Sequence, residues 1–353
     1  MKRTILTLVA IVLSMPMMAQ KYVVTQEHKD RAAEIVKQMT LEEKIAYVGG
    51  YESWYVREIP RLGLPAVRMA DGPQGVRNNT KSTLYPSGVA AAATWDKALI
   101  EQMGISLGKD SRARGVHILL GPGANIYRSP LCGRNFEYFG EDPYLVGEMG
   151  LALVNGYQGD MQGGDDVLAC IKHLIAGSQS INGGNATPTD VSERTLHEVF
   201  LPPYELSVRK GGAGSAMMAH NDINGVPCHS NKWLMEDVLR KEYGFDGFIV
   251  SDWMDIERLH NRQFTATSRK EAYYQSIMAG MDMHMHGIYW NEEVAELVRE
   301  GRIPMSRIDE SVRRILTAKF RLGLFENPYS NVAEGKKVRM CEEHRATALE
   351  AAR

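Results

Sequence analysis

Polar side chains with catalytic potential follow five of six short apolar runs in this sequence. The runs cover residues 66–70, 116–120, 167–171, 215–219, 248–250 and 281–283. The polar residues that lie within two positions of their ends include Asp71, Lys172, His173, His220, Asp252 and His284. Because the carboxyl ends of parallel strands meet at one edge of a sheet or at one mouth of a barrel, we expect these side chains to share one site.

The residue types at that site suit a sugar. Carboxylates and cations hydrogen-bond to hydroxyl groups, and an indole such as Trp253 stacks on the C–H face of a pyranose ring. Arg134 is a further cation expected at the site. A phosphate site needs a glycine-rich loop that opens a helix, and residues 121–123 (Gly-Pro-Gly) are too short and are interrupted by proline. The sequence therefore indicates a pocket for a polyhydroxylated ligand.

Long amphipathic segments separate the apolar runs, which is the alternation of a parallel α/β fold. They predict helices over residues 95–114, 143–157, 191–210, 231–243, 268–279 and 304–322. Thr40 with Glu43, and Asp190 with Glu193, have the spacing of capping boxes that open helices. A (β/α)8 barrel and a doubly wound open sheet both bind ligands at strand carboxyl ends, so the alternation alone leaves both folds open.

Composition and charge exclude several classes of protein. Of the 353 residues, 44% are hydrophobic, and the formal net charge is −2. No basic run is interleaved with aromatic residues, so a nucleic-acid partner is not expected. The four cysteines are widely spaced without a C-x-x-C pair, which favours free, mostly buried thiols, although an oxidising compartment allows one disulfide. The sequence indicates no oligomeric state.

Both ends of the chain differ from this α/β pattern. Residues 1–19 combine two cations, a short apolar stretch and a small residue, which is typical of a secretory signal peptide and predicts a periplasmic or secreted protein. No other stretch is apolar enough to span a membrane. Residues 327–330 read as a linker, and a new helix is expected from Glu342. We interpret 327–353 as a linker and the first helix of a truncated second domain; a helix docked back on the first domain is the alternative.

Five segments of the chain resemble glycoside hydrolase family 3. They are DGPQGVR (71–77), GRNFE with GEDP (133–143), KH (172–173), SER with NG (192–194 and 224–225) and SDW (251–253). Each is a weak signal alone, but five in order across an expected barrel are specific. The resemblance runs from about Thr40 to the end of the chain. It implies an α/β, TIM (β/α)8-like barrel over residues 20–326, allowing a collapsed first strand, followed by an α/β sandwich domain.

The resemblance also implies a mechanism and roles for the site residues. It implies retaining hydrolysis, with Asp252 matching the family's carboxylate nucleophile. The residues that match those holding the hydroxyls of the terminal sugar are Asp71, Arg134, Lys172 and His173. Trp253 matches a wall of that subsite. His220 is also taken as a substrate-binding residue. It stands where the family commonly has Tyr, so the hydrogen bond that orients the nucleophile is either in doubt or made by the imidazole. The general acid/base comes from the second domain in two-domain members and is not expected in this chain. No cofactor and no metal are implied.

These features predict an exo-acting β-glycosidase, foremost a β-glucosidase that releases terminal non-reducing β-D-glucosyl residues from oligosaccharides or glycosides. In the family, Trp after the nucleophile favours glucose over xylose, and a β-xylosidase or a dual-specificity glycosidase is the alternative. A carbohydrate-binding barrel without catalysis is the alternative from another class, because the second carboxylate is missing.

Several of these residues also have structural roles open to them. Asp252 after a strand is also a suitable helix N-cap, and Arg134 is also placed to pair locally with Glu137 or Glu141. Three further residues alternate along the last apolar run, namely Asp282, His284 and His286. Their spacing suits metal ligands on one face of a strand. Histidines that line a barrel mouth are favoured instead, because the family's chemistry needs no metal.

Overall fold

The computed structural model describes residues 24–353 apart from 53, 78–80, 162–163 and 329–331. Its centre is a six-stranded sheet with the order β1-β2-β3-β4-β5-β8. The strands are β1 (Tyr55–Val56), β2 (Val67–Asp71), β3 (Ile118–Leu120), β4 (Leu168–Leu174), β5 (Ser215–Met218) and β8 (Phe248–Val250). β1 is antiparallel to β2, and the other neighbours are parallel. The predicted signal peptide, residues 1–19, lies outside the described residues.

Single backbone bridges carry the sheet from β8 round towards β1. They join Val250 to Met283, Gly49 to His284 and Tyr51 to Tyr55. The strand expected at 281–283 is therefore reduced to bridges, and antiparallel β1 is the irregular part of the ring. The curled sheet is that of a TIM-like barrel, which confirms the expected fold class over a doubly wound open sheet.

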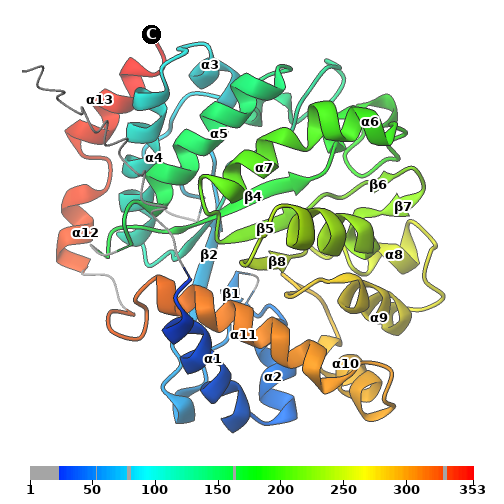
Figure 1. Cartoon of the computed structure of the whole chain (residues 1–353). Helices are drawn as coiled ribbons and strands as arrows, with labels where there is room; N and C mark the ends of the chain where they lie inside the picture. The colour runs from blue at the N-terminus through cyan, green and yellow to red at the C-terminus, as the bar shows by residue number, and fades with distance from the viewer. Residues whose placement is uncertain (1–23, 53, 78–80, 162–163, 329–331) are drawn as a thin grey trace, which may run out of the picture.

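Helices surround this sheet, with α4, α5 and α7 side by side along one flank and α1, α2, α10 and α11 gathered at the other (Figure 1). The α-helices are α1 (Gln26–Gln38), α2 (Leu41–Val48), α3 (Gly88–Ala92), α4 (Lys97–Arg112), α5 (Pro143–Gln158), α6 (Glu193–Thr195), α7 (Pro202–Arg209), α8 (Arg258–Asn261), α9 (Arg269–Ala279), α10 (Trp290–Arg299), α11 (Met305–Arg321), α12 (Val332–Val338) and α13 (Glu342–Glu350). A π-helix covers Trp233–Glu242, where an ordinary helix was expected.

One of the two predicted capping boxes forms. The Thr40 side chain accepts from the backbone N–H of Glu43, and the Glu43 side chain accepts from that of Thr40. The other prediction was wrong, because Ser192 caps α6 in place of Asp190. Residues just before Ser192 are held extended by a hairpin of β6 (Asp222–Ile223) and β7 (Val226–Pro227), since Thr189 pairs with Ile223 in that hairpin. The helix therefore cannot begin earlier.

The helix predicted over residues 191–210 is also broken into three pieces. α6 is followed by a π-helix, Leu196–Phe200, and then by α7. α7 begins at Pro202, which has no backbone N–H to donate into the preceding turn. Two consecutive prolines in the sequence therefore mark the start of a new helix inside the predicted one.

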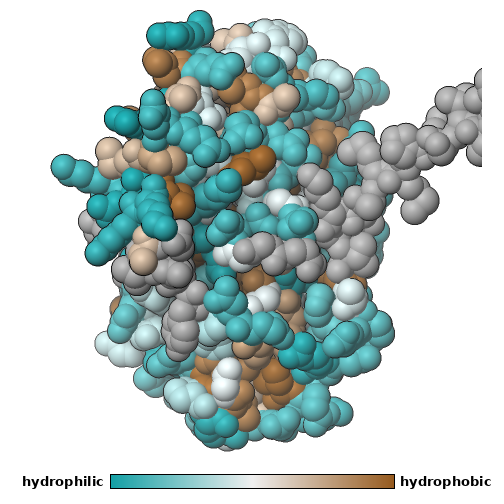
Figure 2. Space-filling model, turned by 90° about the vertical axis from the view of Figure 1, so that its left-hand side faces the viewer, coloured by the Kyte–Doolittle hydropathy of each residue, from teal (hydrophilic) through white to brown (hydrophobic). Residues whose placement is uncertain are grey.

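The last helices pack on the outside of the barrel. α12 and α13 both contact α4, and His344 of α13 is buried with its Nδ1 3.3 Å from Asp110 Oδ1. Figure 2 faces this side of the molecule and shows a largely hydrophilic surface with scattered hydrophobic patches. The proposed domain boundary near residue 327 stays a prediction.

The interior agrees with the composition. Strands β3, β4, β5 and β8 are buried along their whole length, as strands of a covered parallel sheet must be. The four cysteines are free thiols, and three of them are buried, which confirms the expectation. No helix among the described residues has the length and hydropathy to cross a membrane.

Candidate active site

Asp252 lies just beyond the carboxyl end of β8 and is 8% exposed. Its Oδ2 is 3.0 Å from Nε2 of His220 and 3.7 Å from Nε2 of His173. Its Oδ1 accepts a hydrogen bond of 2.6 Å from the backbone N–H of Trp253, and its own N–H donates to Nε2 of His229 at 2.9 Å. Asp252 is therefore held by groups from β4 and from the segments that follow β5, β7 and β8, and His220 and His173 are the histidines expected from the sequence.

The surroundings keep Asp252 ionised. Burial by itself raises the pKa of this carboxyl group, but the proximity and charge of His220 outweigh burial and hold the pKa well below its ordinary value. His229 contributes no charge at neutral pH, because burial lowers its pKa to about 4. An ionised carboxylate is the form that an attacking nucleophile needs.

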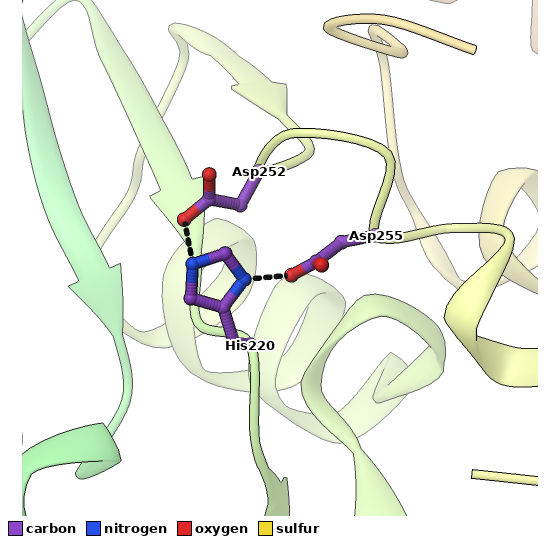
Figure 3. A group of neighbouring side chains, drawn as sticks. All are labelled: His220, Asp252 and Asp255. Atoms are coloured by element: carbon purple, nitrogen blue, oxygen red, sulfur yellow. Dashed lines mark hydrogen bonds and ion pairs between the residues drawn. The ribbon is translucent and has the colours of Figure 1, made fainter. Parts of the chain in front are cut away.

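His220 lies between two carboxylates (Figure 3). Its Nε2 faces Asp252, and its Nδ1 forms a short contact with Oδ2 of Asp255. Burial lowers the pKa of His220, but the two carboxylates outweigh burial and raise it to about 9. The side chain is therefore an imidazolium at neutral pH.

Within the described residues, His220, Asp252 and Asp255 are the one group of such side chains close enough together to hold a metal ion. Both ring nitrogens of His220 face carboxylate oxygens and are protonated at neutral pH. A protonated nitrogen has no lone pair for a metal. The imidazolium offsets one of the two negative charges of the group, and the guanidinium of Arg258, whose Nε lies 2.7 Å from Oδ1 of Asp255, offsets the other. The three side chains therefore form an ion network together with Arg258.

Lys172 and Asp71 form a second ion pair of the site. Lys172 in β4 is 2% exposed, and its Nζ lies 2.5 Å from Oδ1 of Asp71 at the end of β2. Burial raises the pKa of Asp71, but the charge of Lys172, together with more distant Arg77 and Arg134, outweighs burial and lowers it. The pair presents an ionised carboxylate beside a cation, as hydroxyl recognition requires.

His173 is anchored through its backbone. Its N–H donates to Oδ1 of Asn125 at 2.8 Å, and its carbonyl accepts from the amide of Asn125 at 3.2 Å and from the hydroxyl of Tyr204 at 2.8 Å. Burial, reinforced by the charges of Arg134 and Lys172, holds the pKa of the ring well below its ordinary value. His173 is therefore a neutral group beside the Asp252 carboxylate.

Arg134 forms the local ion pair with Glu137 that was the alternative to a sugar contact. Its Nε and one terminal nitrogen donate to the two carboxylate oxygens of Glu137 at 2.9 and 2.8 Å. Its charge nevertheless acts on Asp71 and His173, and the charge of Asp252 acts on it. Arg134 thus lies among the other expected residues, already paired.

Trp253 forms an aromatic wall beside Asp252. It stacks on His286 with ring centroids 4.3 Å apart and an interplanar angle of 17°, and Trp54 lies 5.4 Å away. His284 instead faces Glu257 at 3.1 Å, and buried Asp282 is bound by three arginines. The alternating residues 282, 284 and 286 therefore have separate partners rather than a shared metal, and His286 is the one stacked on Trp253.

Three neighbours of this centre were not expected from the sequence, namely His229, Asp255 and Arg258. Arg258 Nε lies 2.7 Å from Oδ1 of Asp255, whose Oδ2 faces His220. The spacing of Asp252, Asp255 and Arg258 by threes was visible and places them on one turn-rich segment. Nothing in the sequence shows that this segment faces His220, because His220 follows a different strand.

A TIM-like barrel with an ionised, buried carboxylate and sugar-type polar groups at its strand ends is the architecture of a barrel glycoside hydrolase. The profile described as "Glycosyl hydrolase family 3 N terminal domain" matches residues 20–318. The chain belongs to glycosyl hydrolase family 3, and the resemblance inferred from the five segments is confirmed.

Characterised relatives include both glucosidases and a xylosidase. A β-xylosidase of Formosa agariphila is 38% identical over 347 residues, which are 93% of this chain and 47% of that protein. The thermostable β-glucosidase B of Acetivibrio thermocellus is 38% identical over 302 residues, covering 81% of this chain and 37% of that protein. The chain therefore spans less than half the length of these two relatives.

Solved structures share the fold. The β-glucosidase of Listeria innocua in complex with glucose superposes with a TM-score of 0.84 at 31% identity, over 92% of this chain and 51% of that one. β-Glucosidase 3B of Thermotoga neapolitana, in complex with α-D-glucose, gives a TM-score of 0.78 at 35% identity, over 91% of this chain and 46% of that one.

Proposed function

We propose that this chain is the nucleophile-bearing barrel of a retaining exo-β-glycosidase that hydrolyses terminal non-reducing β-D-glucosyl residues. The observation that supports this most is Asp252, a buried carboxylate held ionised at the end of β8 by His220. The β-glucosidase names of several relatives, and the glucose in two structures of similar fold, support the choice of sugar.

The proposed reaction begins with attack of the Asp252 carboxylate on the anomeric carbon. The bond from that carbon to the leaving oxygen breaks as the glycosyl ester forms, and water later displaces the carboxylate with net retention. In this proposal the Asp71–Lys172 pair, Arg134 and His173 hold the sugar hydroxyls, and Trp253 walls the subsite. A strand end fixes the approach of the nucleophile more rigidly than a long loop does.

A β-xylosidase is the second candidate, because the relative from Formosa agariphila with that name covers 93% of this chain. The ratio of kcat/KM for aryl β-glucoside and aryl β-xyloside separates the two activities.

Export and the second domain remain proposals that depend on residues 1–19 and 327–353 of the sequence.

Covalent labelling tests the nucleophile. We expect 2,4-dinitrophenyl 2-deoxy-2-fluoro-β-glucoside to add one fluorosugar to the chain, since its leaving group departs without an acid, and peptide mapping to place the sugar on Asp252. Asp252→Asn is expected to abolish the mass increase. Asp237→Asn, a surface carboxylate paired with Lys241, is the matched control and is expected to label normally.

Labelling of Asp252→Asn, or a label on another carboxylate, contradicts the proposed nucleophile. Sugar binding by the chain without any label favours the alternative of a carbohydrate-binding barrel without catalysis.

A further inference from the structure

We propose that His220 is a positioning residue held as an imidazolium between Asp252 and Asp255, and that its charge favours release of the sugar from the covalent intermediate. This inference rests on the proposed function and deepens it. It also assigns a role to Asp255 and Arg258, which are not among the residues proposed to bind the sugar.

The geometry makes His220 a bridge between two buried acids. Its ring nitrogens face Oδ2 of Asp252 at 3.0 Å and Oδ2 of Asp255 at shorter range. Asp255 is 1% exposed, so its negative charge needs a partner inside the protein. Figure 3 shows the imidazole between the two carboxylates, which come from the same turn after β8.

Arg258 is the remaining charged side chain of this network and contacts both Asp255 and His220. Its Nε lies 2.7 Å from Oδ1 of Asp255, and one of its terminal nitrogens lies 3.3 Å from Nδ1 of His220. The guanidinium orients Asp255 and limits how strongly Asp255 alone can hold the proton on His220. The charge of Asp252 is therefore needed as well.

The remaining titratable groups that face His220 are neutral. The ring of His173 stacks on it with centroids 6.2 Å apart, and Nδ1 of His229 lies 3.8 Å from Asp255. Burial lowers the pKa of both histidines, far below the ordinary value for His173 and to about 4 for His229. The protonation of His220 near neutral pH is thus governed by its burial and by Asp252 and Asp255.

The covalent step changes this balance. When Asp252 bonds to the anomeric carbon and the leaving group departs with its electron pair, the carboxylate becomes a neutral ester. His220 then loses one of the two negative charges that hold its proton. In the second step the bond from the anomeric carbon to Asp252 breaks, its electron pair returns to the carboxylate, and the ion pair with His220 is restored. By linkage, the stabilisation of protonated His220 by ionised Asp252 favours this release.

The charge has opposite effects on the two steps. A neighbouring cation makes Asp252 a weaker base and a slower nucleophile, and the same cation makes it a better leaving group. Loss of the cation is therefore expected to slow release while attack is unchanged or faster. Simple structural damage slows both steps.

The protonation state is measured by histidine NMR on the ¹⁵N-labelled chain, with His220→Gln to assign the signal. We expect His220 to titrate near pH 9 and its pKa to fall by roughly 1–3 units in Asp252→Asn and in Asp255→Asn. Asn at 252 mimics the neutral ester, and Asp237→Asn is the matched surface control. A His220 that is neutral at pH 7, or a pKa that Asp255→Asn leaves unchanged, overturns the proposal.

The kinetic role is measured with the fluorosugar label. Inactivation reports attack, and recovery in azide reports release, because azide needs no general base. For Asp255→Asn we expect recovery to slow by up to about tenfold for each pKa unit that His220 loses, with inactivation unchanged or faster. His197→Gln, on the surface, is expected to match the wild-type chain. Equal slowing of both steps, or unchanged recovery, overturns the kinetic role.

The outcomes separate the two proposals. Absence of labelling in the wild-type chain, or labelling of Asp252→Asn, counts against the proposed function and removes the kinetic role with it. The NMR titration still decides whether His220 is a cation between Asp252 and Asp255. Normal labelling with normal recovery in Asp255→Asn leaves the nucleophile in place and refutes the role of His220.

Discussion

At the scale of single residues, paired charges set the ionisation of the candidate site. Lys172 holds Asp71 ionised, Arg134 is paired with Glu137, and His220 holds Asp252 ionised. Each carboxylate is thereby fixed as an acceptor of hydrogen bonds and not as a donor. A neutral polyol offers the donors that such acceptors need, which agrees with the sugar proposed as ligand.

Asp71→Asn tests this recognition. A hydrogen bond to a charged group contributes roughly 1.5–3 kcal/mol, so the variant is expected to bind gluconolactone roughly 10- to 100-fold more weakly. Isothermal titration calorimetry on the chain measures the change, with Asp237→Asn as the matched control and the thermal unfolding midpoint as the check on folding. Affinity within twofold of wild type contradicts a role of Asp71 in binding.

At the scale of elements, buried ion pairs fasten the barrel to its outer helices. Asp282, which lies directly before the bridge at Met283, is fully buried and accepts from Arg307 and Arg314 of α11 and from Arg240 of the π-helix 233–242. Its side chain also accepts from the backbone N–H of Ile249 in β8 at 2.9 Å. One carboxylate therefore ties two helices to two neighbouring segments of the ring.

Asp282→Asn is expected to destabilise the chain by roughly 3–5 kcal/mol, because it leaves three arginines in a buried site without their anion. Burial raises the pKa of Asp282, but the arginines outweigh burial and lower it to about 2. A carboxyl whose folded-state pKa is lowered stabilises the fold above its unfolded pKa of about 3.9, and this stability is lost as the pH falls through 2.

Urea unfolding at pH 7, and at several pH values between 4 and 2, measures both effects. The wild-type chain is expected to lose about 2 kcal/mol more than the variant across that acid range. A variant that is as stable as wild type at pH 7, or that shows the same acid dependence, refutes the role assigned to Asp282.

At the scale of the whole molecule, the residues that the structure describes give the proposed nucleophile no ready proton donor of the carboxyl type. The carboxylates described at this site are engaged with cations, Asp71 with Lys172, Glu137 with Arg134 and Asp255 with His220 and Arg258. A carboxyl group that acts as general acid must be protonated near neutral pH, which these ion pairs oppose.

The chain by itself is therefore expected to depend strongly on the leaving group. We compare the ratio of the rate on 2,4-dinitrophenyl β-glucoside to the rate on cellobiose. For this chain the ratio should be roughly 10²- to 10⁴-fold larger than for a β-glucosidase with its acid in place. Initial rates with a series of aryl glucosides measure this as the slope of log kcat against leaving-group pKa. A flat slope, with efficient cleavage of cellobiose, shows that an acid is present in the chain.

The sequence by itself predicted the alternating α/β order and the residues at the strand ends, because apolar runs and helical periods are local patterns. The choice of a barrel over an open sheet came from the resemblance to glycoside hydrolase family 3. Asp71, Lys172 and His173 lie at the carboxyl ends of strands, and His220 and Asp252 lie just after strands, that the sequence located to within a few residues. Parallel strands must bring these ends together. The segment predicted as one helix over 191–210 is helical from residue 193 to residue 209, with a break before Pro202. Its start is later than predicted because of pairing to the β6–β7 hairpin, which no local pattern reveals.

Only the tertiary structure decided which charged side chains pair with one another. The pairing of Arg134 with Glu137 was one of two local options in the sequence, and the pairing of His220 with both Asp252 and Asp255 joins segments that follow different strands. Ionisation in a buried site depends on distances of a few ångströms between groups far apart in the chain, and those distances exist only once the ring of strands has closed.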